Sequence, residues 1–148
     1  MAIGERIRFF RKLRGLTMKY LGMSVGFPES NADVRIAQYE NDSRAPKAEL
    51  TAKLADVLGV APEALKVTDI DSDVGVMHTL FALEDRYSFR IETSGDGIRL
   101  TVDPTKNQEA ERIHKLMCQW RNAAAKLESG EITREEYDQW RYSFHGFE

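Results

Sequence analysis

The sequence contains little cysteine, since Cys118 is the only one among 148 residues. A single cysteine cannot form a disulfide bond within the chain, which fits a reducing compartment. The longest apolar stretch, VGVMHTLFAL, is well short of the ~18 residues that span a bilayer. The first residues, MAIGERIRFFRKLRG, also lack the apolar segment and cleavage site of a signal peptide. We therefore expect a cytoplasmic protein with no membrane segment.

A large net charge is also missing, because the formal charge is only −3 and 42% of the residues are hydrophobic. These values are typical of a globular protein and argue against one that coats nucleic acid indiscriminately. The overall net charge hides a difference between the two halves of the sequence. Residues 1–66 hold eleven Lys and Arg against eight Asp and Glu, a net charge of +3, whereas residues 67–148 hold ten against sixteen, a net charge of −6. This division indicates a polyanion-binding module joined to a second part.

Signatures of enzymes and metal sites are absent as well, since we find no Walker loop, no GxSxG and no HExxH. Residues 69–73 resemble the start of a calcium loop, but Val74 and Leu80 stand where such a loop needs Gly and Glu. His114 and Cys118 share a helix face, yet two ligands are too few for a structural zinc site. We expect no enzymatic activity, no catalytic residue, no metal and no cofactor.

Apolar residues at helical spacing predict five helices in the first part of the chain. They cover about residues 3–14, 18–25, 32–41, 46–58 and 62–66. Thr17 can cap the second helix, and Gly59 can end the fourth. The side chains expected to face the core include Ile3, Ile7, Phe10, Leu13, Leu21, Val25, Ile36, Tyr39, Leu50, Leu54 and Leu58.

The remaining sequence predicts a small α+β region. Helical spacing continues at about residues 73–86, with Val76, Leu80 and Leu83 facing inward, and again at 106–128. Between them, alternating apolar and polar residues around Gly95-Asp96-Gly97 predict a β-hairpin. Thr133 and Glu136 have capping-box spacing and should start a last helix. We expect a DNA-binding domain at 1–67, a linker at 68–74 and a C-terminal region at 75–148. Since a lone hairpin is marginally stable, that region is either a compact unit or a dimerisation element.

Residues 3–66 resemble the Cro/C1-type (XRE-like) helix-turn-helix family. The segments that carry the resemblance are IGERIRFFRKLRGLT, IAQYENDSRAP, LTAKLADVLGV and APEAL, in that order. The resemblance implies an all-α, five-helix lambda-repressor-like domain whose third helix enters the major groove of DNA. The alternative is a helical bundle whose basic residues are only a solvated face.

This sequence departs from the family pattern in three places. Met18 stands where members often have Gln, and Gly22 stands where they often have Ala. The link between the second and third helices is about four residues longer than usual, through Pro28, Glu29, Ser30 and Asn31. The tight turn is therefore expanded, which leaves the docking angle of the third helix open.

The resemblance implies which side chains meet DNA. Gln38 can pair with adenine, Arg35 with guanine, and Val34 can contact a thymine methyl group. Lys19, Arg44 and Lys47 are candidates for phosphate contacts, which position the protein without reading sequence. The full predicted set is Thr17, Lys19, Asn31, Asp33, Val34, Arg35, Gln38, Arg44 and Lys47.

These observations predict a sequence-specific, repressor-like transcription regulator that binds double-stranded DNA as a homodimer through its C-terminal half. One alternative is an antitoxin-like protein whose C-terminal half binds another protein. A second is a regulator that responds to a small molecule enclosed by the hairpin and the C-terminal aromatic residues Tyr137, Trp140, Tyr142, Phe144 and Phe147.

Overall fold

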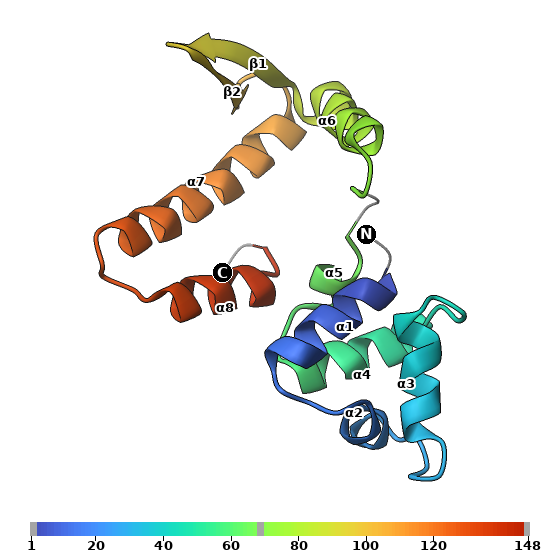
Figure 1. Ribbon diagram of the computed structural model, residues 1–148. Coiled ribbons are helices and arrows are strands. Elements are labelled where there is room, and N and C mark those ends of the chain that lie inside the picture. The colour runs from blue at the N-terminus through green and yellow to red at the C-terminus, as the bar shows by residue number, and fades with distance from the viewer. Residues whose placement is uncertain (1–2, 68–69, 147–148) are drawn as a thin grey trace. The chain divides into compact units, whose positions relative to one another are not determined.

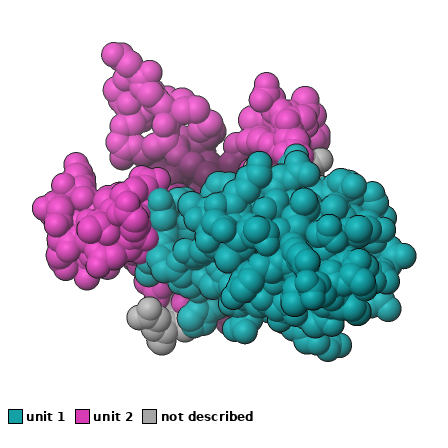
Figure 2. All heavy atoms as spheres, turned by 60° about the horizontal axis from the view of Figure 1, so that its bottom comes forward, with its two compact units in different colours: residues 1–69, 138–145 teal, residues 70–137, 146–148 magenta. Residues whose placement is uncertain are grey.

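The computed structural model describes residues 3–67 and 70–146, which form eight helices and two strands (Figure 1). These residues divide into two compact units, coloured separately in Figure 2. The first unit contains residues 3–67 and 138–145, and the second contains 70–137 and 146. Residues 68 and 69 of the expected linker, and Phe147, lie outside the described residues. No helix in the described ranges is long and apolar enough to cross a bilayer.

The first unit is a five-helix bundle, as predicted. It comprises α1 (Ile3–Leu13), α2 (Met18–Ser24), α3 (Ala32–Glu40), α4 (Ala48–Leu58) and α5 (Pro62–Leu65). Its core forms because each helix carries an apolar stripe, and the largest fully buried apolar side chains are Ile7, Phe10, Leu21, Ile36, Leu54, Leu58 and Leu65. The prediction for Leu13 is wrong, since its side chain is 52% exposed. It lies in the last turn of α1, beyond the part of the helix that the core covers.

Local capping explains two of the helix boundaries in this unit. The Thr17 hydroxyl accepts a hydrogen bond from the Tyr20 backbone N–H at 3.0 Å, which confirms Thr17 as the N-cap of α2. Gly59 follows α4 with φ +67°, the left-handed conformation that glycine adopts without a steric penalty.

The second unit contains α6 (Asp73–Tyr87), the hairpin of β1 (Phe89–Ser94) and β2 (Gly97–Val102), α7 (Gln108–Glu128) and the start of α8 (Arg134–Ser143). The predicted hairpin is confirmed, with a loop of Gly95 and Asp96. The expectation that Val76 faces a core is wrong, because it is 36% exposed and no described residue of α6 is buried. The second unit provides too little apolar cover for α6.

The start of α8 is fixed by the predicted capping box. The Thr133 hydroxyl accepts from the Glu136 N–H at 3.2 Å, and the Glu136 carboxylate accepts from the Thr133 N–H at 2.7 Å. The hydrogen bond from the Thr133 N–H stabilises the ionised carboxylate and so lowers the pKa of Glu136 below its ordinary value. Within the second unit, Tyr137 is tied to α7 because its hydroxyl accepts from the Trp120 indole N–H at 2.7 Å.

The end of α8 belongs to the first unit and packs against its N-terminal helices. The Tyr142 ring meets the Phe10 ring edge-on, with centroids 4.9 Å apart. The Tyr142 carbonyl accepts from the Ala61 N–H at 2.9 Å, and the Gln139 amide bridges the Arg14 guanidinium and the Gly59 carbonyl. Residues 138–145, which include Gln139 80 residues beyond Gly59, therefore complete this unit and pack against Phe10 of α1.

Candidate nucleic-acid interface

Helix α3 lies unusually close to the two helices that support it. A β-carbon added to Gly22 of α2 would lie 2.5 Å from the Ala32 carbonyl oxygen at the start of α3. A β-carbon on Gly4 of α1 would collide with the Tyr39 carbonyl at the other end of α3. Glycine is required wherever two backbones approach so closely. The two glycines thus allow α3 to pack closely at both of its ends. The close contact at Gly22 also explains why this chain has glycine where related sequences often have alanine.

An ion pair joins α1 to the end of α3. The Glu40 carboxylate is buried, with 1% of its side chain exposed, and it accepts from the Arg11 guanidinium Nη2 at 2.9 Å. Arg8 adds a second cation at 3.3 Å from Glu40. The hydrogen bond to Glu40 raises the pKa of Arg11, so the guanidinium remains charged. Since Arg11 also donates to the Leu16 carbonyl, one side chain holds the α1–α2 turn and α3 together.

The long α2–α3 link folds onto the domain. The Phe27 ring stacks on the Tyr39 ring with centroids 6.2 Å apart, and the Phe27 N–H donates to the Gly22 carbonyl at 2.9 Å. Ile36 and Tyr39 are 0% and 9% exposed, which confirms both as inward-facing residues of α3. The extra residues of the link therefore leave the packing of α3 against α2 intact.

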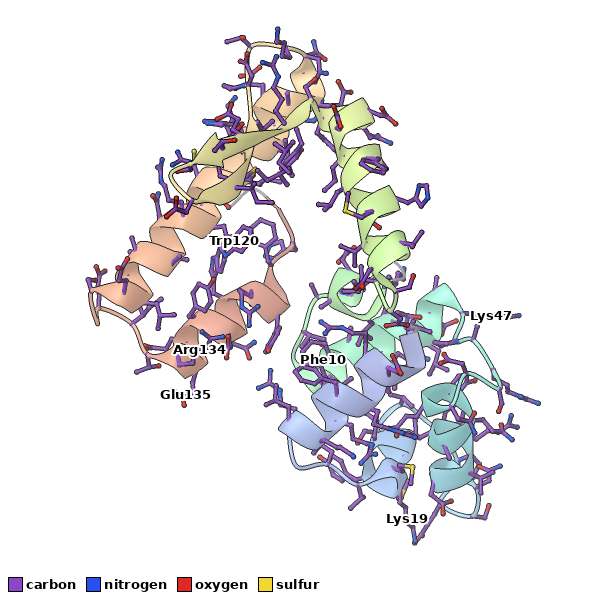
Figure 3. All side chains as sticks on the ribbon, turned by 45° about the horizontal axis from the view of Figure 1, so that its top comes forward. Phe10, Lys19, Lys47, Trp120, Arg134 and Glu135 are labelled. Carbon is purple, nitrogen blue, oxygen red and sulfur yellow. The ribbon has the colours of Figure 1, made fainter. Side chains whose placement is uncertain are left out.

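Six of the nine predicted DNA-contacting residues have exposed side chains: Thr17, Lys19, Asp33, Val34, Arg44 and Lys47. Figure 3 shows Lys19 and Lys47 extending outward from the first unit. Lys19 lies beside the link that leads into α3, and Lys47 follows the loop that leaves it. Between them, Asp33 and Val34 occupy the exposed side of the first turn of α3. Along the chain, one exposed lysine therefore precedes the exposed first turn of α3 and another follows the helix.

The other three predicted residues, Asn31, Arg35 and Gln38, are half-buried. The Arg35 guanidinium lies 6.0 Å from the centre of the Phe27 ring, a cation–π contact that holds it against the link. The side-chain oxygens of Asn31 and Gln38 are buried, and neither has a hydrogen-bond partner among the described residues. An unpaired buried amide costs free energy, so rotating Gln38 towards a ligand carries little penalty.

The link also brings an acidic residue to the interface, which sequence reasoning missed. The Glu29 carboxylate lies 2.8 Å from the Lys19 ammonium. This hydrogen bond lowers the pKa of Glu29 and raises that of Lys19, so both groups stay charged. Glu29, Ser30, Lys19 and Asp33 line one shallow surface hollow. Phe27 was missed for the same reason as Glu29: loop residues carry no periodicity that would show where they fold.

The remaining candidate sites lie in the second unit. The Cys118 sulfur is 3.8 Å from His114 Nδ1, on one face of α7. Across the described ranges, no group of three His, Cys, Asp or Glu side chains could hold a metal ion. Asp69, the first residue of the rejected calcium loop, lies outside those ranges.

Comparison with known proteins agrees with the geometry of the first unit. Residues 7–65 match a family model described as a helix-turn-helix, HTH_3. The matched segment runs from Ile7 in α1 to the end of α5. No curated protein matches the chain.

Proposed function

We propose that this chain binds a specific two-fold symmetric DNA site as a homodimer and represses transcription there. The proposal starts from residues 7–65, which are a Cro/C1-type helix-turn-helix domain. The domain makes the protein a DNA-binding transcription regulator of the XRE kind. The observation that carries the proposal is the exposed first turn of α3, with Val34 53% exposed, between the cations Lys19 and Lys47. Such a face fits the major groove, with the lysines near phosphates on either side.

The second unit supports the homodimer. Along α6, Val74, Met77 and Phe81 recur at helical spacing, and each is between 44% and 68% exposed. In the hairpin, Ile91 is 68% exposed and Ile98 is 75% exposed. Apolar side chains gathered in this way mark surfaces that bind a partner. Two copies joined there would present two DNA-binding domains to two half-sites.

Selection of bound DNA from a random pool, at two salt concentrations, tests the proposal. We expect enrichment of one site with two-fold symmetry and a loss of affinity as salt rises, because counterions leave the phosphates on binding. A pool that yields no enriched sequence contradicts specific recognition. Repression is tested with the enriched site placed in a reporter promoter, where expressing the protein should lower transcription.

Substitutions then distinguish residues that recognise bases from residues that only hold the protein on the DNA backbone. Arg35→Ala and Gln38→Ala should relax the preference at one base pair each, costing about 1–3 kcal/mol on the preferred site. Lys47→Ala should weaken binding to every sequence by a similar factor and reduce the salt dependence. Lys66→Ala is the matched control, since Lys66 is an exposed lysine just after α5, and should bind as the unsubstituted protein does.

Binding of a different protein is the second candidate role, because the exposed stripe of α6 suits a partner helix as well as a second copy. Purification from the native host distinguishes the two. A stable complex with another protein favours the antitoxin-like function, whereas a pure homodimer favours the regulator. A small-molecule effector would need an enclosed apolar pocket in the second unit, and binding of such a ligand should shift the unfolding temperature.

A further inference from the structure

The β-hairpin has one apolar face that is covered at its base and bare towards its tip. The register pairs Phe89 with Val102, Ile91 with Leu100 and Thr93 with Ile98, so all six side chains share one face. Phe89 is 6% exposed, but Ile91 is 68% exposed. Among the described residues, no further strand flanks the hairpin (Figure 1). The outer edge of β1 is therefore open to another strand.

The backbone groups that point outward from β1 follow from the register. The two-residue loop makes Ser94 and Gly97 a hydrogen-bonded pair, and such pairs alternate along an antiparallel ladder. Glu92 and Arg90 therefore bond to β2. The N–H and C=O groups of Phe89, Ile91 and Thr93 point the other way, towards the open edge.

The charges of β1 are arranged to accept a second copy of the same strand. Arg90 and Glu92 flank Ile91 and lie on the face opposite the apolar one. We propose that the protein dimerises by antiparallel pairing of β1 with β1 of a second copy, centred on Ile91. Each Arg90 then lies opposite Glu92 of the other copy, and each Phe89 lies opposite Thr93. The outward backbone groups of Ile91 meet each other as a hydrogen-bonded pair.

Other registers of the same edge are less favourable. Moving the centre by one residue sets Arg90 against Arg90, or Glu92 against Glu92, and like charges directly opposite each other are destabilising. Pairing through β2 brings no opposite charges together, because Arg99 is its one charged residue. Pairing β1 of one copy with β2 of another leaves an unpaired strand edge at each end. Further copies can then add without limit, so the assembly does not close into a dimer. The β1 pair centred on Ile91 is closed and complementary.

Dimerisation in this way also strengthens each hairpin. Two strands alone are marginally stable, whereas the order β2-β1-β1-β2 makes a four-stranded sheet with a continuous apolar face. The exposed isoleucines at position 91 come together at its centre. This inference rests on the homodimer of the proposed function and assigns its interface.

Charge reversal tests the pairing. Arg90→Glu sets a carboxylate at position 90 against Glu92 of the second copy and should raise the dimer dissociation constant about tenfold or more, as seen by sedimentation equilibrium. Within its own hairpin, residue 90 faces the neutral Thr101, so the fold should be retained. The complementary variant is Glu92→Arg combined with Arg99→Glu, which preserves an opposite-charge pair inside the hairpin. It should lose dimers in the same way.

Mixing the two variants is the decisive step, because each strand then meets opposite charges on the other. We expect heterodimers with nearly the original affinity. Lys106→Glu, an exposed residue after β2 with the same change in charge, is the control and should leave dimerisation unaltered. If both variants dimerise normally, or if mixing restores nothing, β1 pairing is wrong although the homodimer stands. If the unsubstituted protein is monomeric on its DNA site, the proposed homodimer fails as well.

Discussion

At the scale of single residues, Glu40 shows how a buried charge can anchor the helix proposed to read DNA. Its carboxylate is 1% exposed and is bonded to Arg11, which is itself 12% exposed. Removing one partner of such a pair leaves the other charge buried without compensation. The pair therefore matters more for the position of α3 than an exposed pair such as Glu49 with Lys53, since ion pairs in contact with water contribute little.

We predict that Glu40→Gln lowers the free energy of unfolding by about 3 kcal/mol, because Arg11 then lacks a counter-ion. Urea unfolding followed by circular dichroism measures it. Replacing both Glu40 and Arg11 by leucine should recover part of the loss, since no buried charge remains. Glu49→Gln, in an exposed pair with Lys53, serves as the control and should change stability little. A Glu40→Gln protein as stable as the original would contradict the anchoring role.

Glu29 gives a second residue-scale prediction, on DNA affinity. Its carboxylate forms an ion pair with the Lys19 ammonium, the group that we propose contacts a DNA phosphate. Glu29→Gln should therefore release Lys19 and raise the affinity for the selected DNA site about threefold, with a steeper salt dependence. Fluorescence anisotropy at two salt concentrations measures both effects. Glu63→Gln, an exposed glutamate on α5, removes the same charge elsewhere and should have a smaller effect.

At the scale of elements, the sequence indicates the helices well and their spacing poorly. Ile36 and Tyr39 could be placed inside because they lie three residues apart on one helix face. The closeness of α2 and α3 could not be predicted, since Gly22 in an apolar pattern looks like a weak helix position. The hairpin could be predicted from its alternation. The element that covers its apolar face could not be predicted, because periodicity indicates which face is buried and not what it packs against.

We predict that Gly22→Ala destabilises the first unit by about 1–3 kcal/mol, because the added β-carbon meets the Ala32 backbone, which cannot move aside as a side chain could. α3 should also shift, so affinity for the selected DNA site should fall. Thermal unfolding and DNA titration measure the two effects. Ser24→Ala, at an exposed position of the same helix, should leave both nearly unchanged. Unaltered stability of Gly22→Ala would show that the helices separate easily.

At the scale of the whole molecule, the two halves of the sequence differ in charge, +3 against −6, but the units do not follow that division completely. Residues 138–145 come from the acidic half and pack on the basic one. No pattern in the sequence indicates this, because a contact between residues about 80 positions apart leaves no local periodicity. The domain boundaries at 67 and 75 stay a prediction. The structure adds residues 138–145 to the first unit, and we call them the returning segment.

The returning segment should stabilise the DNA-binding unit. The Tyr142 ring contacts Phe10 and Phe9 edge-on, with centroids 4.9 Å and 6.1 Å apart, and aromatic pairs of this kind contribute beyond the area they bury. We predict that Tyr142→Ala lowers the stability of the first unit by about 1–3 kcal/mol. Amide hydrogen exchange in α1 and α4 reports on this unit alone. Tyr20→Ala, which removes a tyrosine that is 58% exposed, should leave that exchange unaltered. If exchange in α1 is equally slow in both variants, residues 138–145 do not support the DNA-binding unit in solution.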